Sequence, residues 1–285
     1  MNNRNWPAKA FYFPLTRMVI GLLPVLASVL LGELVKNELG GSGPHPGTEF
    51  LLSVVQVMLV LATYVLIFSW YEKRQVTELG LSCFFRDGLT GFASGLAIQS
   101  LSVLVLFWSG GYRIVSVNPL SFLLPGLTFA LVAGFVGEIV LRGVAFLLLE
   151  ELLGTAIALG GFVLLFALMH LRQPGATLLS VLSIAIQGGL LLSASYVFAR
   201  NLWMPIFLHF AWDLAEPGIF GGSNPGTSLD RSLFHSTSGG PGILSGGQFG
   251  PGNSLQATLF CLALSGWFLW KARRRNHILP PAWKR

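Results

Sequence analysis

Charged side chains are scarce in this sequence. Only 11% of its 285 residues are Asp, Glu, Lys or Arg, and 53% are hydrophobic, whereas an ordinary soluble domain is about 25% charged. The mean hydropathy is +0.68. A soluble globule cannot bury so large an apolar fraction, so the composition excludes this class and indicates a membrane protein.

Cysteine is almost absent as well. Cys83 and Cys261 are far apart in apolar surroundings, which excludes a disulfide framework and a cysteine zinc site and predicts two packing residues. The chain also lacks a phosphate-binding glycine motif, a coiled-coil heptad and a repeat of fixed period. The net charge is +6, but the basic residues stand in short groups between apolar runs. This pattern predicts contact with a lipid bilayer and no nucleic-acid partner.

Long apolar runs are present throughout. A membrane-spanning helix needs about 20 mostly apolar residues, and the chain supplies eight candidates. We therefore predict an all-α fold, a polytopic membrane helical bundle of about eight transmembrane helices. The candidates are Phe11–Gly32, Phe50–Tyr71, Gly88–Gly110, Leu120–Leu149, Thr155–His170, Thr177–Ala199, Leu202–Ala215 and Leu255–Trp270.

The distribution of Lys and Arg predicts the orientation. With eight spans, 13 of the 18 basic residues lie on the side of the termini, four lie on the other side, and Arg142 lies within a span. The positive-inside rule then places both termini in the cytoplasm, and we predict a multi-pass protein of a bacterial plasma membrane. We divide the chain into a two-helix segment (1–76), a membrane core (77–271) that includes a long outer loop rich in Gly, Ser and Pro (217–253), and a basic tail (272–285).

Apart from Arg17 near the start of the first span, five acidic, basic or histidine residues fall within the predicted spans: Glu138, Arg142, His170, His209 and Asp213. Each such residue costs at least about 2.5 to 3.5 kcal/mol in a bilayer, so each suggests a function. The four-residue spacings of Glu138 with Arg142 and of His209 with Asp213 put each pair on one helix face. A turn near Gly154 would bring Glu138 and His170 to the same depth. Together the five form a set able to activate water or hold a metal.

The segments that carry these residues are similar to the three ordered motifs of the CPBP family of intramembrane proteases, which includes type II CAAX prenyl endopeptidases and Abi-like proteins. The family motifs are two adjacent glutamates followed by arginine, a phenylalanine four before a histidine, and a histidine four before asparagine or aspartate. The matching segments are Gly137-Glu-Ile-Val-Leu-Arg142, Phe166-Ala-Leu-Met-His170 and His209-Phe-Ala-Trp-Asp213. The resemblance extends over roughly residues 78–270. It implies catalytic Glu138, His170, His209 and Asp213, with Arg142 and Phe166 in support.

One position departs from this pattern. Gly137 stands where the family has its first glutamate, the residue thought to activate water in the prenyl endopeptidases. Glycine cannot accept a proton, and loss of a general base typically costs about 10² to 10⁴ in rate. The departure therefore weakens the inference of activity and leaves the inference of fold unchanged.

Three interpretations stay open. In the first, Glu138 with His170 polarises water without a metal. In the second, His170, His209 and Asp213 bind zinc or another divalent metal, as in a metalloendopeptidase, and Glu138 is the base for bound water. In the third, the protein is catalytically silent and binds a hydrophobic or lipidated peptide. A transporter would favour two corresponding halves with broken helices, which the sequence does not show.

The predicted topology also bears on the substrate. The predicted site lies about 16 residues, or roughly 24 Å of helix, from the cytoplasmic turn near Gly154. Its mouth would then face the outer leaflet and the long loop. We expect the substrate to be an exported or membrane-embedded peptide.

Overall fold

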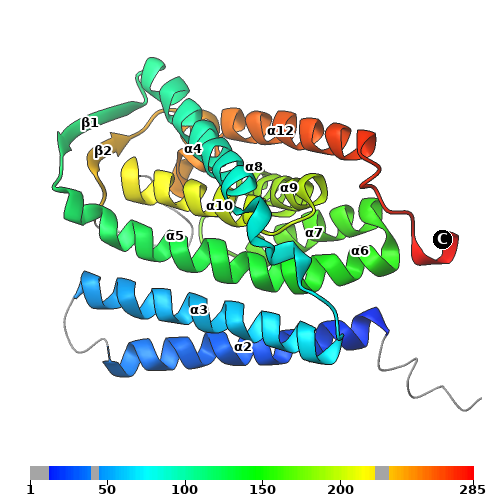
Figure 1. Cartoon of the computed structure of the whole chain (residues 1–285). Coiled ribbons are helices and arrows are strands. Elements are labelled where there is room, and N and C mark those ends of the chain that lie inside the picture. Colours follow the sequence, from blue (N-terminus) through cyan, green and yellow to red (C-terminus); the bar gives the residue numbers. More distant parts are fainter. Residues whose placement is uncertain (1–12, 40–44, 222–230) are drawn as a thin grey trace, which may run out of the picture.

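The computed structural model describes residues 13–39, 45–221 and 231–285, which fold as a polytopic helical bundle (Figure 1). All eight predicted spans are helical over most of their described residues; Phe11 and Tyr12 lie outside the description. Among the described residues, five helical segments are long and apolar enough to cross a membrane, and the count of eight crossings stays a prediction. These five are Pro14–Leu39, Pro46–Tyr71, Thr77–Trp108, Leu120–Leu153 and Leu178–Ala199.

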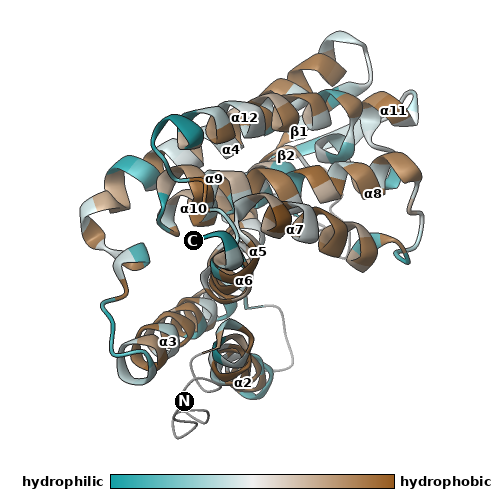
Figure 2. Cartoon of the chain, turned by 90° about the vertical axis from the view of Figure 1, so that its right-hand side faces the viewer, coloured by the Kyte–Doolittle hydropathy of each residue, from teal (hydrophilic) through white to brown (hydrophobic). Residues whose placement is uncertain are grey.

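Helices α2 and α3 form a layer at one side of the bundle. Helix α2 (Pro14–Leu39) packs along α3 (Pro46–Tyr71), and α3 packs against α5 (Leu123–Glu138). Figure 1 shows this layering, and Figure 2 shows hydrophobic residues along most of the helical surface. Apolar side chains face both outward and inward because lipid, unlike water, does not penalise an exposed leucine.

The core helices follow in chain order, and three of them change to π-helical geometry near the predicted site residues. π-Helical segments are rare in proteins, and those that occur are often found at functional sites. They are η5, directly after Glu138, η6, and η7, directly after Asp213. The elements are α4 (Phe84–Trp108), α5, η5 (Ile139–Phe146), α6 (Leu147–Leu153), α7 (Thr155–His170), α8 (Leu178–Ile184), η6 (Ala185–Leu191), α9 (Leu192–Ala199), α10 (Trp203–Asp213), η7 (Leu214–Ile219) and α12 (Leu255–Arg274).

Gly154 makes the turn between α6 and α7 and confirms the predicted helical hairpin. Its φ of +80° lies in the left-handed region, which glycine adopts without strain. The chain after α12 also returns to this turn, because Thr155 N–H donates to the carbonyl of Leu279 at 3.0 Å. A Cβ atom at Gly154 would lie 2.7 Å from the backbone nitrogen of Pro281. A side chain there would push the returning tail away.

Glycines bring α10 into close contact with the helices on both sides. A Cβ atom on Gly91 or Gly95 of α4 would lie 2.2 or 2.3 Å from backbone carbonyl oxygens of α10, and one on Gly134 of α5 would lie 2.9 Å from the Phe210 nitrogen. Small residues four apart allow this approach in membrane helices. The glycines therefore place α10, which carries two site residues, at a fixed distance from α4 and α5.

We expect Gly91→Ala to destabilise the protein by about 1 to 3 kcal/mol, because the added methyl group would overlap the carbonyl of Met204. The matched control is Gly160→Ala in α7, where an added Cβ meets nothing within 4 Å and where alanine is the better helix former. Thermal unfolding in detergent measures both. Equal midpoints for the two variants would show that α4 and α10 can separate without cost.

A two-stranded sheet lies at one end of the bundle. Strand β1 (Tyr112–Val117) pairs antiparallel with β2 (Phe234–Ser238), with Tyr112 opposite Ser238 and Val117 opposite Phe234. The sequence analysis predicted no strand and treated 217–253 as one loop. This was wrong for the described part, which also contains α11 (Gly242–Ser245) and the 3₁₀ turns η8 (Gly247–Phe249) and η9 (Pro251–Asn253). Residues 222–230 of the predicted loop lie outside the description. Short strands that pair across more than 100 residues leave little local signal.

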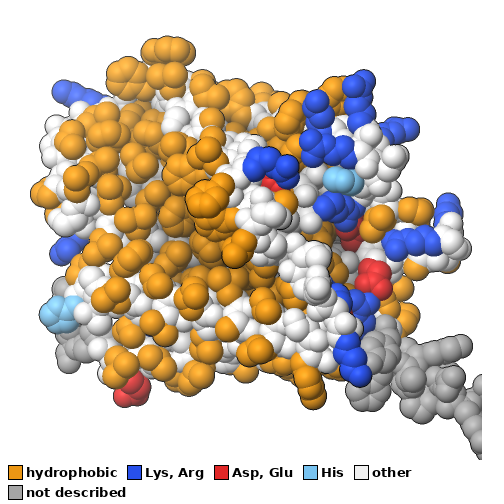
Figure 3. Space-filling model, viewed as in Figure 1, with side chains coloured by type: hydrophobic (Ala, Val, Ile, Leu, Met, Phe, Trp, Pro, Cys, Tyr) orange, Lys and Arg blue, Asp and Glu red, His pale blue; other side chains and the backbone are white. Residues whose placement is uncertain are grey.

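The basic side chains gather at the opposite end of the molecule. Figure 3 shows Lys and Arg concentrated near the C-terminus and a broad hydrophobic surface between this end and the sheet. This end is the one predicted to be cytoplasmic, and the orientation stays a prediction; the hydrophobic band is the surface expected to contact lipid.

Candidate active site

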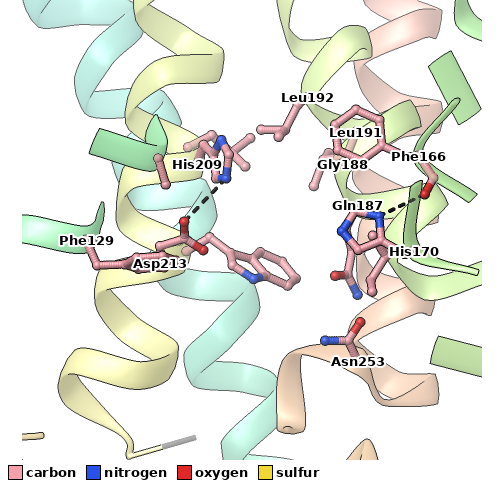
Figure 4. A pocket seen from close by; sticks show the side chains of 14 residues that line it. Phe129, Phe166, His170, Gln187, Gly188, Leu191, Leu192, His209, Asp213 and Asn253 are labelled. Carbon is pink, nitrogen blue, oxygen red and sulfur yellow. Dashed lines mark hydrogen bonds and ion pairs between the residues drawn. The ribbon is translucent and has the colours of Figure 1, made fainter. Parts of the chain in front are cut away.

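A small cavity of about 220 Å³ lies inside the bundle between α10 on one side and α7 with η6 on the other. His209 and Asp213 face it from α10, and His170 faces it from the opposite wall (Figure 4). The structure therefore brings three of the predicted catalytic residues to one cavity. Its other lining residues are Phe129, Ala133, Phe166, Ile184, Gln187, Gly188, Leu191, Leu192, Leu208, Trp212 and Asn253.

Glu138 lies behind this cavity and is fully buried. Its Oε1 accepts hydrogen bonds from Arg142 Nη1 at 2.9 Å and from His209 Nδ1 at 2.8 Å. No described residue is bonded to its Oε2. Glu138 thus contacts His209 directly and does not line the cavity with His170, although the hairpin predicted that the two would face each other.

Arg142 explains why Glu138 and His170 are apart. Its guanidinium donates to the carbonyl of Gly188 in η6 and lies 5.1 Å from the ring centre of Phe166 in α7. The positive charge therefore occupies the space between Glu138 and α7. Phe166 also stacks on His170, with ring centres 6.2 Å apart and planes inclined by 9°. Arg142 therefore contacts Phe166, and Phe166 in turn contacts His170.

His209 stands between two carboxylates. Its Nδ1 bonds to Glu138 as above, and its Nε2 lies 3.4 Å from Asp213 Oδ2. The bond to Glu138 uses the proton on Nδ1, so Nε2 can donate only in the imidazolium form. Two carboxylates beside one imidazole favour that form. The group of Glu138, Arg142, His209 and Asp213 then balances two negative and two positive charges.

His170 has one nitrogen bonded and one directed into the cavity. Its Nδ1 lies 2.8 Å from the carbonyl oxygen of Phe166. A carbonyl can only accept, so Nδ1 carries the proton and, in a neutral ring, Nε2 has a free lone pair. Figure 4 shows this second nitrogen facing the α10 side of the cavity. His170 is therefore placed to take a proton from a water molecule there.

Gly137 leaves open space beside His209. A Cβ atom at this position would meet only His209, at 3.7 Å from Cε1 and 4.0 Å from Nδ1, which are ordinary contacts. The Cα–Cβ bond of a larger residue at position 137 would thus be directed towards the imidazole of His209. The first atom of the glutamate side chain in the family pattern would therefore fit here without displacing the helices.

The predicted metal ligands are not gathered around one point in the described part of the chain. Across the described residues, no group of three or more His, Cys, Asp or Glu side chains is arranged to hold a metal ion. Both nitrogens of His209 already face carboxylates, and His170 lies on the other wall. The metal-binding role of His170, His209 and Asp213 stays a prediction.

The structure also adds three residues to the site region that the sequence analysis did not single out. Gln187 and Asn253 line the cavity. Glu216 is buried three residues after Asp213 and accepts hydrogen bonds from the Gly252 N–H at 2.7 Å and from Gln99 at 3.1 Å. The sequence did contain a signal for Glu216, because a carboxylate stands there beside Pro217 at the end of an apolar run. Neutral amides in a membrane span carry no comparable signal, because they are cheaper to insert than charges.

The fold and the cavity together define a polytopic membrane protein with ionisable side chains gathered inside a helical bundle. Residues 119–215 match the family model described as type II CAAX prenyl endopeptidase Rce1-like. This match confirms the resemblance to the CPBP family and covers all three motifs. At the level of the family it supports an intramembrane endopeptidase of the CAAX protease type. No curated protein and no solved structure matches the chain.

Proposed function

We propose that this protein is an intramembrane endopeptidase that hydrolyses a peptide bond of a membrane-associated or exported peptide. The observation that carries the proposal is the placement of His170 on one wall of a largely apolar cavity and of His209 with Asp213 on the other. A water molecule and a peptide carbonyl between these walls would meet a proton acceptor on one side and a proton donor on the other. General acid and base groups so placed contribute about 10²- to 10⁴-fold in rate.

His170 is the general base in this proposal. Water attacks the carbonyl carbon of the peptide bond while its proton moves to His170 Nε2, and a C–O bond forms. The same proton then passes from Nε2 to the departing nitrogen as the C–N bond breaks. The bond from Nδ1 to the Phe166 carbonyl holds the ring in the tautomer that this transfer requires.

His209 stabilises the negative oxygen of the tetrahedral intermediate. The contact of its Nε2 with Asp213 is 3.4 Å long, beyond the 2.7 to 3.2 Å of a good N–H···O bond. This N–H is therefore available to the substrate oxygen. Glu138 acts through His209, because it fixes the ring from the other nitrogen at 2.8 Å. In this role Glu138 is a positioning residue.

The position of the cavity supports a substrate that approaches from the outer side. Asn253, which ends the segment following β2, lines the cavity, and the sheet lies away from the basic end of the molecule (Figures 1 and 3). If the basic end is cytoplasmic, the cavity is nearer to the outer leaflet. This placement supports an exported or membrane-embedded peptide as the substrate.

Gly137 favours a second function. No carboxylate side chain occupies the open space beside His209 that Gly137 leaves, and in the family pattern a glutamate stands there. A protein without this base could hold a hydrophobic or lipidated peptide in the cavity without cleaving it. Cleavage distinguishes the two functions, because a silent protein binds the same peptides and leaves them intact.

The test is hydrolysis by the purified protein in liposomes, with quenched fluorescent peptides that include a farnesylated CAAX peptide and unlipidated membrane peptides. We expect cleavage of at least one peptide, and we expect His170→Ala to slow it by at least about 10²-fold because the base is lost. His235→Ala, on an exposed part of β2, is the matched control and should cleave normally. Undiminished cleavage by the His170→Ala protein would refute the assigned mechanism.

A further inference from the structure

One buried side chain that lines the cavity carries a polar atom without a partner. Asn253 is 3% exposed and lines the cavity, and its Nδ2 donates to the carbonyl of Phe249 at 3.0 Å. This bond fixes the orientation of the amide and leaves Oδ1 as the free acceptor, with no hydrogen bond to any described residue. Buried acceptors are nearly always satisfied, and an unsatisfied one costs about 1 to 3 kcal/mol. The donor for Asn253 Oδ1 therefore does not come from the described residues.

The turn that carries Asn253 is held rigidly from behind. The Glu216 carboxylate accepts the Gly252 N–H at 2.7 Å, and a Cβ atom at residue 252 would lie 2.3 Å from Glu216 Oε2. On the cavity side, Gln187 donates to the Gly252 carbonyl at 2.5 Å. Both backbone polar groups of residue 252 are thus occupied. The neighbouring Asn253 is positioned before any ligand arrives, which lowers the cost of binding.

The surroundings of Asn253 define the kind of donor. Figure 4 shows the amide groups of Asn253 and Gln187 at one end of the cavity, with His209 and Asp213 on the wall across from His170. A cationic donor would be drawn to the carboxylate of Asp213. The neutral amide end suits a neutral N–H, and an extended peptide in an apolar cavity needs acceptors for its backbone N–H groups because no bulk water supplies them.

We propose that Asn253 is a substrate-binding residue whose Oδ1 accepts a hydrogen bond from one backbone N–H of the peptide in the cavity. This inference rests on the proposed function for its substrate class. The cavity of about 220 Å³ is smaller than the roughly 300 to 1,000 Å³ of drug-sized pockets. It therefore admits only a short stretch of peptide, and the bonded N–H belongs to a residue close to the cleaved bond.

Binding, measured apart from cleavage, tests the inference. The probes are the farnesylated CAAX peptide and an unlipidated membrane peptide, each with one backbone amide N-methylated in turn, and the readout is the Kd for the full-length protein in detergent. We expect one N-methylation to weaken binding about tenfold, the effect of one hydrogen bond worth roughly 1.4 kcal/mol. Equal effects at every position, or no binding of any probe, would overturn the inference.

The Asn253→Leu variant then identifies the acceptor. We expect this variant to bind the unmodified peptide about tenfold more weakly and to be insensitive to the critical N-methylation, because both changes remove the same bond. Gln256→Leu is the matched control: its Oε1 is also buried without a partner, but it lies on α12 outside the cavity, and it should leave the N-methylation effect intact. If the losses of affinity from Asn253→Leu and from the critical N-methylation add, the assignment is overturned.

The two proposals can fail separately. If the wild-type protein shows the N-methylation pattern and cleaves no peptide, the endopeptidase proposal falls and Asn253 remains the peptide-binding residue of a silent protein. If peptides are cleaved and the double change is additive, the function stands and the role of Asn253 is refuted. The scan on the wild-type chain needs no variant, so a failure of Asn253→Leu to fold does not prevent a decision.

Discussion

Gly137→Glu is expected to raise the rate of peptide hydrolysis by up to about 10²- to 10⁴-fold, the usual range for a general base, because it adds a second proton acceptor to the one that His170 supplies. The side chain has room, because a Cβ at this position approaches only the His209 ring, at 3.7 Å. A carboxylate there would stand beside the cavity, whereas the Glu138 carboxylate is already bonded to Arg142 and His209. The rate is measured with the peptide panel at equal amounts of folded protein.

Gly137→Gln is the control for this substitution. Glutamine has the size and the polarity of glutamate but cannot take a proton at neutral pH, so we expect no increase. Equal activation by Gln and Glu would show that the effect comes from packing and would refute the role of a base. Cleavage by Gly137→Glu alone, with an inactive wild-type chain, would identify the natural protein as a silent member that binds peptides.

Glu138→Ala is expected to lower the free energy of unfolding by about 3 to 5 kcal/mol. The substitution leaves the guanidinium of Arg142, which is fully buried, without its carboxylate, and it removes the bond to His209. A buried charge without a counter-charge is among the most costly defects in a protein interior. Thermal or denaturant unfolding in detergent, followed by circular dichroism, measures the change.

Two further variants separate the ion pair from other effects. The double variant Glu138→Ala/Arg142→Met removes both charges, and we expect it to recover most of the lost stability because no charge remains unpaired. Glu33→Ala breaks a pair with Lys36 in which the Glu33 side chain is 46% exposed, and it should cost less than about 1 kcal/mol. A loss in Glu138→Ala no greater than in Glu33→Ala would contradict a structural role for the buried pair.

Much of the fold could be predicted from local sequence. Helix Thr155–His170 has the predicted bounds, and Leu178–Ala199 differs from its prediction by one residue. Apolar length is sufficient for such predictions because a bilayer forces each crossing segment to satisfy its own backbone, which only a helix does within one segment. The β1–β2 sheet was missed, since its strands are short and partner over a long separation.

Several residues of the candidate site could be predicted from the sequence, but their contacts could not. Ionisable residues within apolar runs identified Glu138, Arg142 and His170, because their insertion is costly and needs a reason. The expectation that Glu138 faces His170 was based only on the number of helical residues between each of them and the turn at Gly154. In the structure the Gly188 carbonyl and the Phe166 ring bind Arg142 between them, and the pairing of Glu138 is instead with His209.

The linear order of residues was enough to establish a membrane-embedded helical bundle, its main helices and three spaced motifs, because hydropathy and helical periodicity act over a few turns of one segment. The arrangement of these motifs depended on how the segments pack. Gly91 and Gly134 set the distance of α10 from its neighbours, and the turn ending at Asn253 brings an amide oxygen into the cavity from far along the chain. Such contacts arise from close approach between helices, which no property of a single segment specifies.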